Sequence, residues 1–193
     1  EERGFDVPVP SFAKNDVPEL RAAALGTAIH GLLAGLSLNH CPDTDVPAFL
    51  QQEAARLAAD NRFPADCLPS LDVSGIAAFL QSPLGRRLRA AKRVERELEF
   101  AVEQSADTLL GEGCNEPVLL QGVIDCCFTE SNGWVLLDFK TDRLFNGQPA
   151  REVAEKHRAQ LALYASALET LSGMPVLEQY IVMLSACENV RMA

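Results

Sequence analysis

The sequence predicts a mixed α/β domain, in which a helical region precedes a small mixed β-sheet. Apolar residues recur at helical spacing in the first half of the chain, and alternate as they do in strands in the second half. The 193 residues suffice for one such domain with a sizeable core. We therefore expect a single domain over residues 17–193, helical over 17–92 and with the sheet in 93–193, and a linker or surface arm over 1–16.

Three helical segments are expected in the first part. One begins at Pro18, a second runs from Val46 to Ala59 after a cap signal, and residues 71–91 form a third that breaks at Ser82-Pro83. Residues 61–70 are rich in turn formers. The first helix carries one apolar stripe, made by Leu25, Ile29, Leu32, Leu33 and Leu36.

The second part alternates like a sheet. Val94–Val102 is predicted as a strand, with Val94, Leu98 and Phe100 on one side and Glu95, Glu97 and Glu99 on the other. After a polar loop at 105–117, a hairpin joins 118–128 to 134–140 through an Asn132-Gly133 turn. A helix from Pro149 to about Leu171, stopped by Gly173, and a strand over 176–184 complete the order.

The hairpin gathers three charged side chains on one face. Val135, Leu137 and Phe139 make the apolar face of the second strand, so Asp138 and Lys140 share the other. With Asn132-Gly133 as the two-residue turn, Asp125 is expected opposite Lys140 and diagonal to Asp138. Diagonal neighbours lie ~7–8 Å apart at the backbone, within reach of a shared cation.

Two carboxylates beside a lysine suit phosphodiester hydrolysis. Mg²⁺ and Mn²⁺ prefer oxygen ligands, and a lysine can stabilise the negative charge that develops on the phosphate. The structural alternative is a solvated strand face with a cross-strand Asp–Lys pair, worth ~0.2–1 kcal/mol.

Composition narrows the function classes. The net charge of −10 argues against a simple nucleic-acid-binding module, although an acidic metal site is compatible with it. The six cysteines form no CxxC pair, so neither a zinc site nor an iron–sulfur cluster is expected, and free thiols suit a reducing cytoplasm. No apolar stretch is long enough to cross a bilayer, and the start at Glu1 suggests a segment of a longer polypeptide.

Five segments together resemble a known family. They are Gly26-Thr-Ala-Ile-His30, Arg96-Glu97-Leu-Glu-Phe100, Gly122-Val-Ile-Asp125, Leu137-Asp138-Phe139-Lys140 and Gln160-Leu-Ala-Leu-Tyr164. In this order and spacing they resemble the RecB-type branch of the PD-(D/E)XK nucleases, most nearly the C-terminal nuclease domain of AddA-type helicase–nucleases. The resemblance implies a restriction-endonuclease-like core with a helical elaboration at its N-terminal end.

The resemblance also implies roles for individual residues. Asp125 and Asp138 would bind Mg²⁺, for which Mn²⁺ can substitute, and Lys140 would be the catalytic lysine. His30 and the carbonyl oxygen of Phe139 would add metal ligands. Glu97 would be a further catalytic carboxylate, although Glu95 and Glu99 share its predicted face. Gln160 and Tyr164 would touch DNA or brace the lysine, and His157 is either a second contact or an ordinary surface histidine.

The function so implied is Mg²⁺-dependent DNA cleavage, by an exonuclease that acts in double-strand break repair and recombination. The expected partners are single-stranded DNA, helicase domains of the same parent chain and a second subunit of AddB or RecC type. The chain itself has no Walker-type phosphate loop, so it cannot carry the ATP-driven motor. Two alternatives stay open: a catalytically silent module that guides DNA or partner subunits, and a stand-alone nuclease of restriction or phage type.

Overall fold

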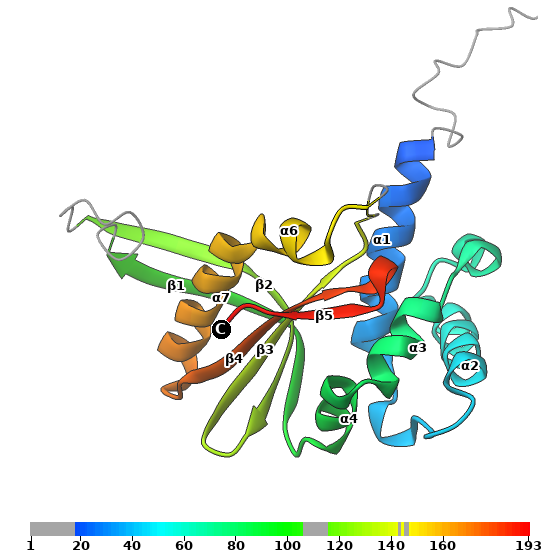
Figure 1. Ribbon diagram of the computed structural model, residues 1–193, viewed down its shortest axis with the longest axis horizontal. Coiled ribbons are helices and arrows are strands. Elements are labelled where there is room, and N and C mark those ends of the chain that lie inside the picture. The colour runs from blue at the N-terminus through cyan, green and yellow to red at the C-terminus, as the bar shows by residue number, and fades with distance from the viewer. Residues whose placement is uncertain (1–17, 106–115, 143, 145–146) are drawn as a thin grey trace, which may run out of the picture.

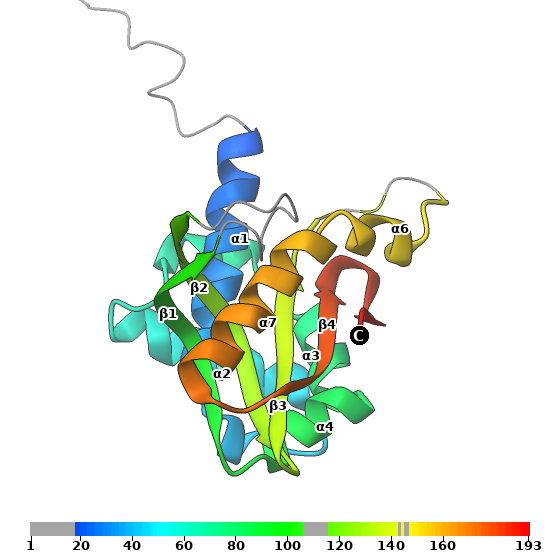
Figure 2. The ribbon, with the colours of Figure 1, turned by 90° about the vertical axis from the view of Figure 1, so that its left-hand side faces the viewer.

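The computed structural model describes residues 18–105, 116–142, 144 and 147–193. Its five strands form one sheet in the order β1-β2-β3-β4-β5, antiparallel except for the parallel pair β3 and β4. Helices lie on both faces of this sheet, as Figures 1 and 2 show. The expected α/β class, a small mixed sheet flanked by helices, is confirmed. The predicted arm over 1–16 and most of the predicted loop over 105–117 lie outside the described residues.

The elements follow one another as helices first, then strands. The helices are α1 (Pro18–Gly35), α2 (Val46–Ala59), α3 (Ser74–Gln81), α4 (Pro83–Ala90), α6 (Ala150–Glu155) and α7 (Arg158–Ser172), with short 3-10 turns at Leu38–His40, Ala65–Ser70 and Leu184–Ala186. The strands are β1 (Val94–Ser105), β2 (Pro117–Glu130), β3 (Gly133–Lys140), β4 (Val176–Met183) and β5 (Glu188–Arg191). No described helix is both long and apolar enough to cross a membrane.

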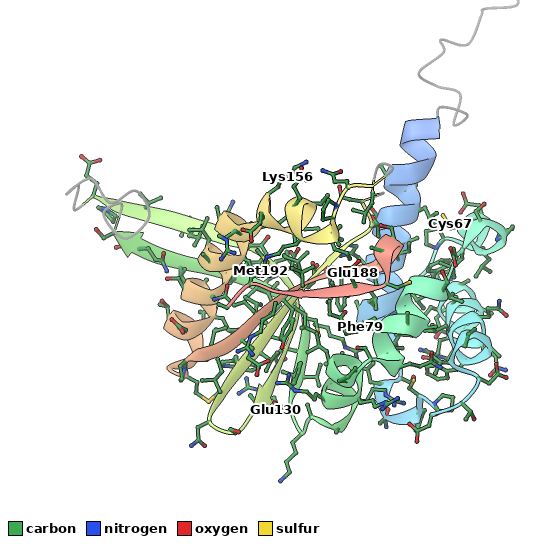
Figure 3. All side chains as sticks on the ribbon, in the orientation of Figure 1. Cys67, Phe79, Glu130, Lys156, Glu188 and Met192 are labelled. Atoms are coloured by element: carbon green, nitrogen blue, oxygen red, sulfur yellow. The ribbon has the colours of Figure 1, made fainter. Side chains whose placement is uncertain are left out.

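Two hydrophobic cores cover the two faces of the sheet. Helices α1–α4 pack against one face, and Phe79 of α3 is labelled on this side in Figure 3. The Phe79 ring meets Phe139 of β3 edge to face, with ring centres 5.3 Å apart. Helices α6 and α7 pack against the other face, over Trp134 and Leu136. Strand β3 is therefore buried on both sides, and its apolar sequence follows from that position.

The helix break predicted at Ser82-Pro83 is confirmed. Ser82 caps α4, because its hydroxyl accepts a hydrogen bond from the Gly85 N–H at 3.1 Å. A Cβ on Gly85 would lie 2.1 Å from the carbonyl oxygen of Phe79, so only glycine lets the two short helices approach this closely.

The predicted hairpin turn is wrong by one residue. Glu130 pairs with Gly133, so the turn is Ser131-Asn132, with Ser131 at a φ of 52°. Gly133 instead begins β3, where a Cβ would lie 2.5 Å from the Leu177 side chain. The glycine thus serves a close approach to the start of β4 and not a turn conformation.

This register moves the charged residues relative to one another. Cys126–Leu137 is the last pair of the β2–β3 ladder, and the same register continued by one step would set Asp125 level with Asp138, not with Lys140. The expectation that Asp125 faces Lys140 and lies diagonal to Asp138 is therefore wrong. In the observed register Asp125 is nearer in level to Asp138 than to Lys140.

The predicted single-face alternation of β1 is also wrong. Val94 packs on the α1 side of the sheet, whereas Leu98 packs on the α7 side. The change of face occurs at Glu97, whose φ of 49° lies in the left-handed region. Strand β2 changes face at the same level, because Ile124 packs on the α7 side and Cys126 on the α1 side.

The C-terminal part differs from the expectation in two places. The helix predicted from 149 to 171 is interrupted at Lys156 and His157, where the backbone N–H groups bond three residues back, to Val153 and Ala154. Gly173 ends α7 with a φ of 67°, as expected. Strand β5 was not predicted, because its four residues, mostly polar, offer no strand pattern long enough to recognise.

The end of α1 is held by a buried carboxylate of α2. Glu53 accepts hydrogen bonds from the Ser37 N–H at 2.8 Å and from the guanidinium of Arg56, which also donates to the Gly35 carbonyl. These contacts, the arginine first, lower the pKa of Glu53 to about 2 despite its burial.

Replacing Glu53 by Gln should lower the free energy of unfolding by about 1–3 kcal/mol at neutral pH, because two charge-assisted contacts are lost. The folded-state pKa of Glu53 lies below its ordinary value of 4.5, so its contribution is complete above that pH and is lost as the pH falls towards 2. Urea unfolding of the chain and of E53Q, from pH 7 down to pH 3, measures this difference. A constant difference over that range would contradict it, and the exposed Glu103→Gln serves as the control.

Candidate metal centre

Three side chains from three elements meet beside the middle of the sheet. One ligand atom each from His30 of α1, Glu97 of β1 and Asp125 of β2 all lie within 4.8 Å of one another. A nitrogen and two carboxylate oxygens at this separation are a donor set that a divalent cation accepts.

Asp125 joins this group to the central strand. One of its carboxylate oxygens lies 3.4 Å from Nδ1 of His30, and the other accepts a hydrogen bond from the Phe139 N–H at 2.8 Å. The contact with Asp125 is the main reason why the pKa of His30 is raised above its ordinary value. A single carboxylate thus fixes both the histidine and the strand that carries Asp138 and Lys140.

Helix α1 brings His30 to the sheet because its apolar side faces the core. Leu32 and Leu33 are buried, while His30 lies at the edge of that stripe and keeps 29% of its side chain exposed. Gly26, one turn earlier, approaches Thr141, whose hydroxyl would be only 3.3 Å from an added Cβ. The glycine allows α1 to lie close to the end of β3.

Glu97 reaches the group through an unusual backbone. Its left-handed φ of 49° costs a non-glycine residue of order 1–3 kcal/mol and is found mainly where function requires it. Glu97 is exposed as a residue, but partial desolvation of its carboxyl and the nearby charge of Asp125 raise its pKa. Both features favour a cation at this point, which would offset the repulsion between the two carboxylates.

A second set of side chains lies on the α7 face of the sheet. The ammonium of Lys140 is 2.8 Å from Oδ2 of the buried Asp138 and donates a hydrogen bond to the Gln160 side chain at 3.2 Å. Gln160 in turn donates to the Tyr164 hydroxyl at 2.9 Å, and the Tyr164 ring packs edge to face on Phe100. Gln160 and Tyr164 therefore brace the lysine in this structure.

The structure separates the predicted site residues into two linked groups. His30, Glu97 and Asp125 form the tight group, while Asp138 and Lys140 pair with each other. Asp138 is still close enough to interact electrostatically with His30 and Asp125. The sequence placed Glu95, Glu97 and Glu99 on one face of β1. Of these three, Glu97 belongs to the tight group.

Other predicted residues stay at the margin. Burial and the nearby positive charge of Lys140 lower the pKa of His157. No contact assigns the Phe139 carbonyl, which remains a proposed ligand.

Arg96 has a role that sequence reasoning missed. Its guanidinium reaches from β1 to the end of α1, where Nη1 donates to the carbonyls of Leu33 and Leu36 at 3.2 and 2.7 Å. Arginine beside Glu97 therefore anchors the helix that carries His30. The only signal in the sequence is its place beside Glu97, because helix-end contacts depend on the tertiary fold.

The buried oxygen of Asp138 tests whether a cation fits here. Oδ2 of Asp138 is buried, and among the described residues its close partner is the Lys140 ammonium at 2.8 Å; burial still raises the pKa of the carboxyl despite this lysine. A buried acceptor left with only an ion pair is costly. Together with the nearby His30, Glu97 and Asp125, it makes the donor set of a hard divalent cation.

A comparison with protein-family models matches this chain over residues 10–189 to the PD-(D/E)XK nuclease superfamily. The chain belongs to the PD-(D/E)XK nuclease superfamily. The family predicted from the five sequence segments is thus confirmed, and the mixed sheet flanked by helices agrees with it.

Curated relatives refine the picture within the superfamily. The chain is 34% identical over 174 residues to an ATP-dependent helicase/nuclease from Alkaliphilus oremlandii, covering 89% of this chain and 14% of the relative. It is 33% identical over 188 residues to the protein of the same name from Alkaliphilus metalliredigens, covering 96% of this chain and 15% of the relative. A third, from Acetivibrio thermocellus, is 36% identical over 167 residues, which cover 84% of this chain and 13% of the relative. The chain therefore spans about one seventh of these relatives.

Manganese binding tests the tight group directly. We expect the chain to bind Mn²⁺, and Asp125→Asn to weaken binding at least about tenfold, because Asp125 contacts both His30 and the Phe139 N–H. Isothermal titration calorimetry measures both affinities.

Glu99→Gln is the matched control, because Glu99 is exposed on the same strand, two residues from Glu97, and outside the group. If D125N and E99Q bind Mn²⁺ equally well, the three residues do not form the metal centre.

Proposed function

We propose that this chain is a divalent-metal-dependent deoxyribonuclease domain that uses Mg²⁺, or Mn²⁺ in its place. The observation that carries the proposal is the convergence of His30, Glu97 and Asp125 within 4.8 Å, beside the Asp138–Lys140 pair. Membership of a nuclease superfamily supports the proposal. So does the hydrogen bond from the Phe139 N–H to Asp125, which joins the three-residue group to the strand that carries Asp138 and Lys140.

The chain's own residues divide the work of hydrolysis. His30, Glu97 and Asp125 would hold the cation, with Asp138 and the Phe139 carbonyl as further donors. When bound, the cation supplies a Lewis acid that withdraws charge from the phosphodiester and makes water a better nucleophile. The remaining chemistry falls to the lysine and its supports.

Lys140 would act on the phosphate from a fixed position, because both of its side-chain partners are themselves held in place. Asp138 is almost fully buried, and Gln160 is held by Tyr164, so the ammonium has little freedom to turn away. A preorganised positive charge stabilises the extra negative charge of the transition state without the cost of reorienting solvent. Lys140 would also orient the attacking water by a hydrogen bond.

The relatives suggest the wider context. Their name describes an ATP-dependent helicase and nuclease, and this chain covers about one seventh of their length. We infer that the domain works within such a longer chain, as an exonuclease on single-stranded DNA that helicase domains deliver, with a second subunit of AddB or RecC type. Its role would be the processing of DNA ends in double-strand break repair and recombination, in the cytoplasm.

The net charge of −10 favours one second candidate, a catalytically silent module that guides DNA or a partner. Such a module needs neither a lysine held by two side chains nor a glutamate at positive φ. Activity measurements separate the two.

Lys140→Ala tests the proposal. We expect the chain to cleave single-stranded DNA with Mg²⁺ or Mn²⁺ and to lose this activity with a chelator. K140A should lower kcat by about 10²-fold or more, the usual effect of removing one group that stabilises transition-state charge. Its Mn²⁺ affinity should remain, since Lys140 is not a ligand.

Gel assays of a labelled oligonucleotide and calorimetry with Mn²⁺ provide the two readouts. Lys156→Ala, which removes an exposed lysine at the end of α6, is the control. Equal activity in the chain and K140A, or none in either with any metal, would favour the silent module.

A further inference from the structure

A cavity of about 460 Å³ lies where α1 ends against the start of β1. Five cationic side chains line it and no acidic side chain does: Arg56, Arg62, Arg89, Lys92 and Arg96. We call it the cationic pocket. Such a concentration is unexpected in a chain whose net charge is −10.

Three of these cations have no carboxylate partner. Arg56 is paired with Glu53, and Arg89 with Asp43. Within the described ranges, no carboxylate forms an ion pair with Arg62, Lys92 or Arg96. The pocket therefore keeps a positive charge that the protein does not neutralise.

Arg96 and Arg89 make the pocket rigid. Arg96 uses only Nη1 to hold the end of α1, so Nε and Nη2 make no hydrogen bond to the described residues. Arg89 is fixed by the carbonyls of Cys41 and Pro42, while its buried Nε has no partner within the described part of the chain. Arginines already ordered by the fold lose little side-chain entropy when an anion binds.

The pocket is next to the candidate metal centre. Both are built on α1 and β1: His30 is five residues before Gly35, which lines the pocket, and Glu97 directly follows Arg96. Five residues of α-helix span about 8 Å. A DNA strand in helical form rises 3.4 Å per nucleotide, so the separation along α1 corresponds to roughly two to three nucleotides. Strand β1 is the edge of the sheet, and Glu97 is exposed on it.

We propose that the cationic pocket binds the phosphodiester backbone of the DNA strand, two or three nucleotides from the phosphate at the metal centre. The inference rests on the proposed nuclease function and extends it by naming how an acidic domain holds its substrate. The exposed Arg62 and Lys92 supply contacts without other partners among the described residues, and Arg96 and Arg89 supply contacts already held by the fold.

The test removes only exposed cations, because Arg96 and Arg89 also hold the fold. In the variant R62Q/K92Q, binding of a fluorescein-labelled single-stranded DNA oligonucleotide is measured by anisotropy in Ca²⁺ over a range of salt concentrations. We expect an affinity about tenfold lower and a salt slope smaller by about 1.4, the value for two lost contacts to a single strand. In cleavage assays the loss should appear as a higher KM.

The control R151Q/R191Q removes the same charge from α6 and from β5, at the opposite edge of the sheet. It should bind DNA like the unmodified chain. Competition by inorganic phosphate should be weak if the pocket recognises a strand and strong if it recognises a single phosphate group, which would overturn the backbone assignment.

Failure of this inference and failure of the nuclease function have different signatures. If the chain cleaves DNA and R62Q/K92Q binds as tightly as the control, the pocket assignment is wrong and the nuclease function stands. If R62Q/K92Q loses affinity but the unmodified chain never cleaves, the pocket stands and the nuclease function is wrong. A chain that neither binds nor cleaves overturns both.

Discussion

The carboxylate of Asp125 is the contact on which the candidate site depends. One oxygen faces His30 of the helical part and the other receives the Phe139 N–H of the central strand. Because β2 lies between β1 and β3, this side chain is the point where the helix, the edge strand and the centre of the sheet are held in register. Loss of this carboxylate would leave a backbone donor unpaired and a histidine without its orienting partner.

The positions of the other site residues follow from the two hydrophobic cores, one on each face of the sheet. The α1–α4 side is a continuous apolar layer, which places His30 at its margin. The α7 side contributes the polar series from Lys140 through Gln160 to Tyr164, supported by the ring of Phe100. The candidate metal ligands and the Lys140 series thus come from different layers, and the central strands β2 and β3 lie between them.

Sequence alone predicted the class of fold, most element boundaries and the superfamily, because apolar periodicity and motif order are local properties. It did not predict the hairpin register, since Gly133 looked like a turn glycine and its real reason, the approach of Leu177, comes from a distant segment. It also missed the change of face at Glu97, since no residue type marks a left-handed glutamate. The contact of Arg96 with α1 was not predicted because, like the approach of Leu177 to Gly133, it joins segments far apart in sequence, here 60 positions.

The left-handed backbone of Glu97 has an evolutionary consequence. Glutamate is a poor choice there for stability, and glycine would relieve the conformational cost while removing the carboxylate. Under the proposed function, selection for cleavage and selection for folding oppose each other at this position. In a descendant that no longer needs this function, we expect Glu97 to be replaced by glycine or asparagine. Such a replacement would mark the loss of activity before the fold itself changed.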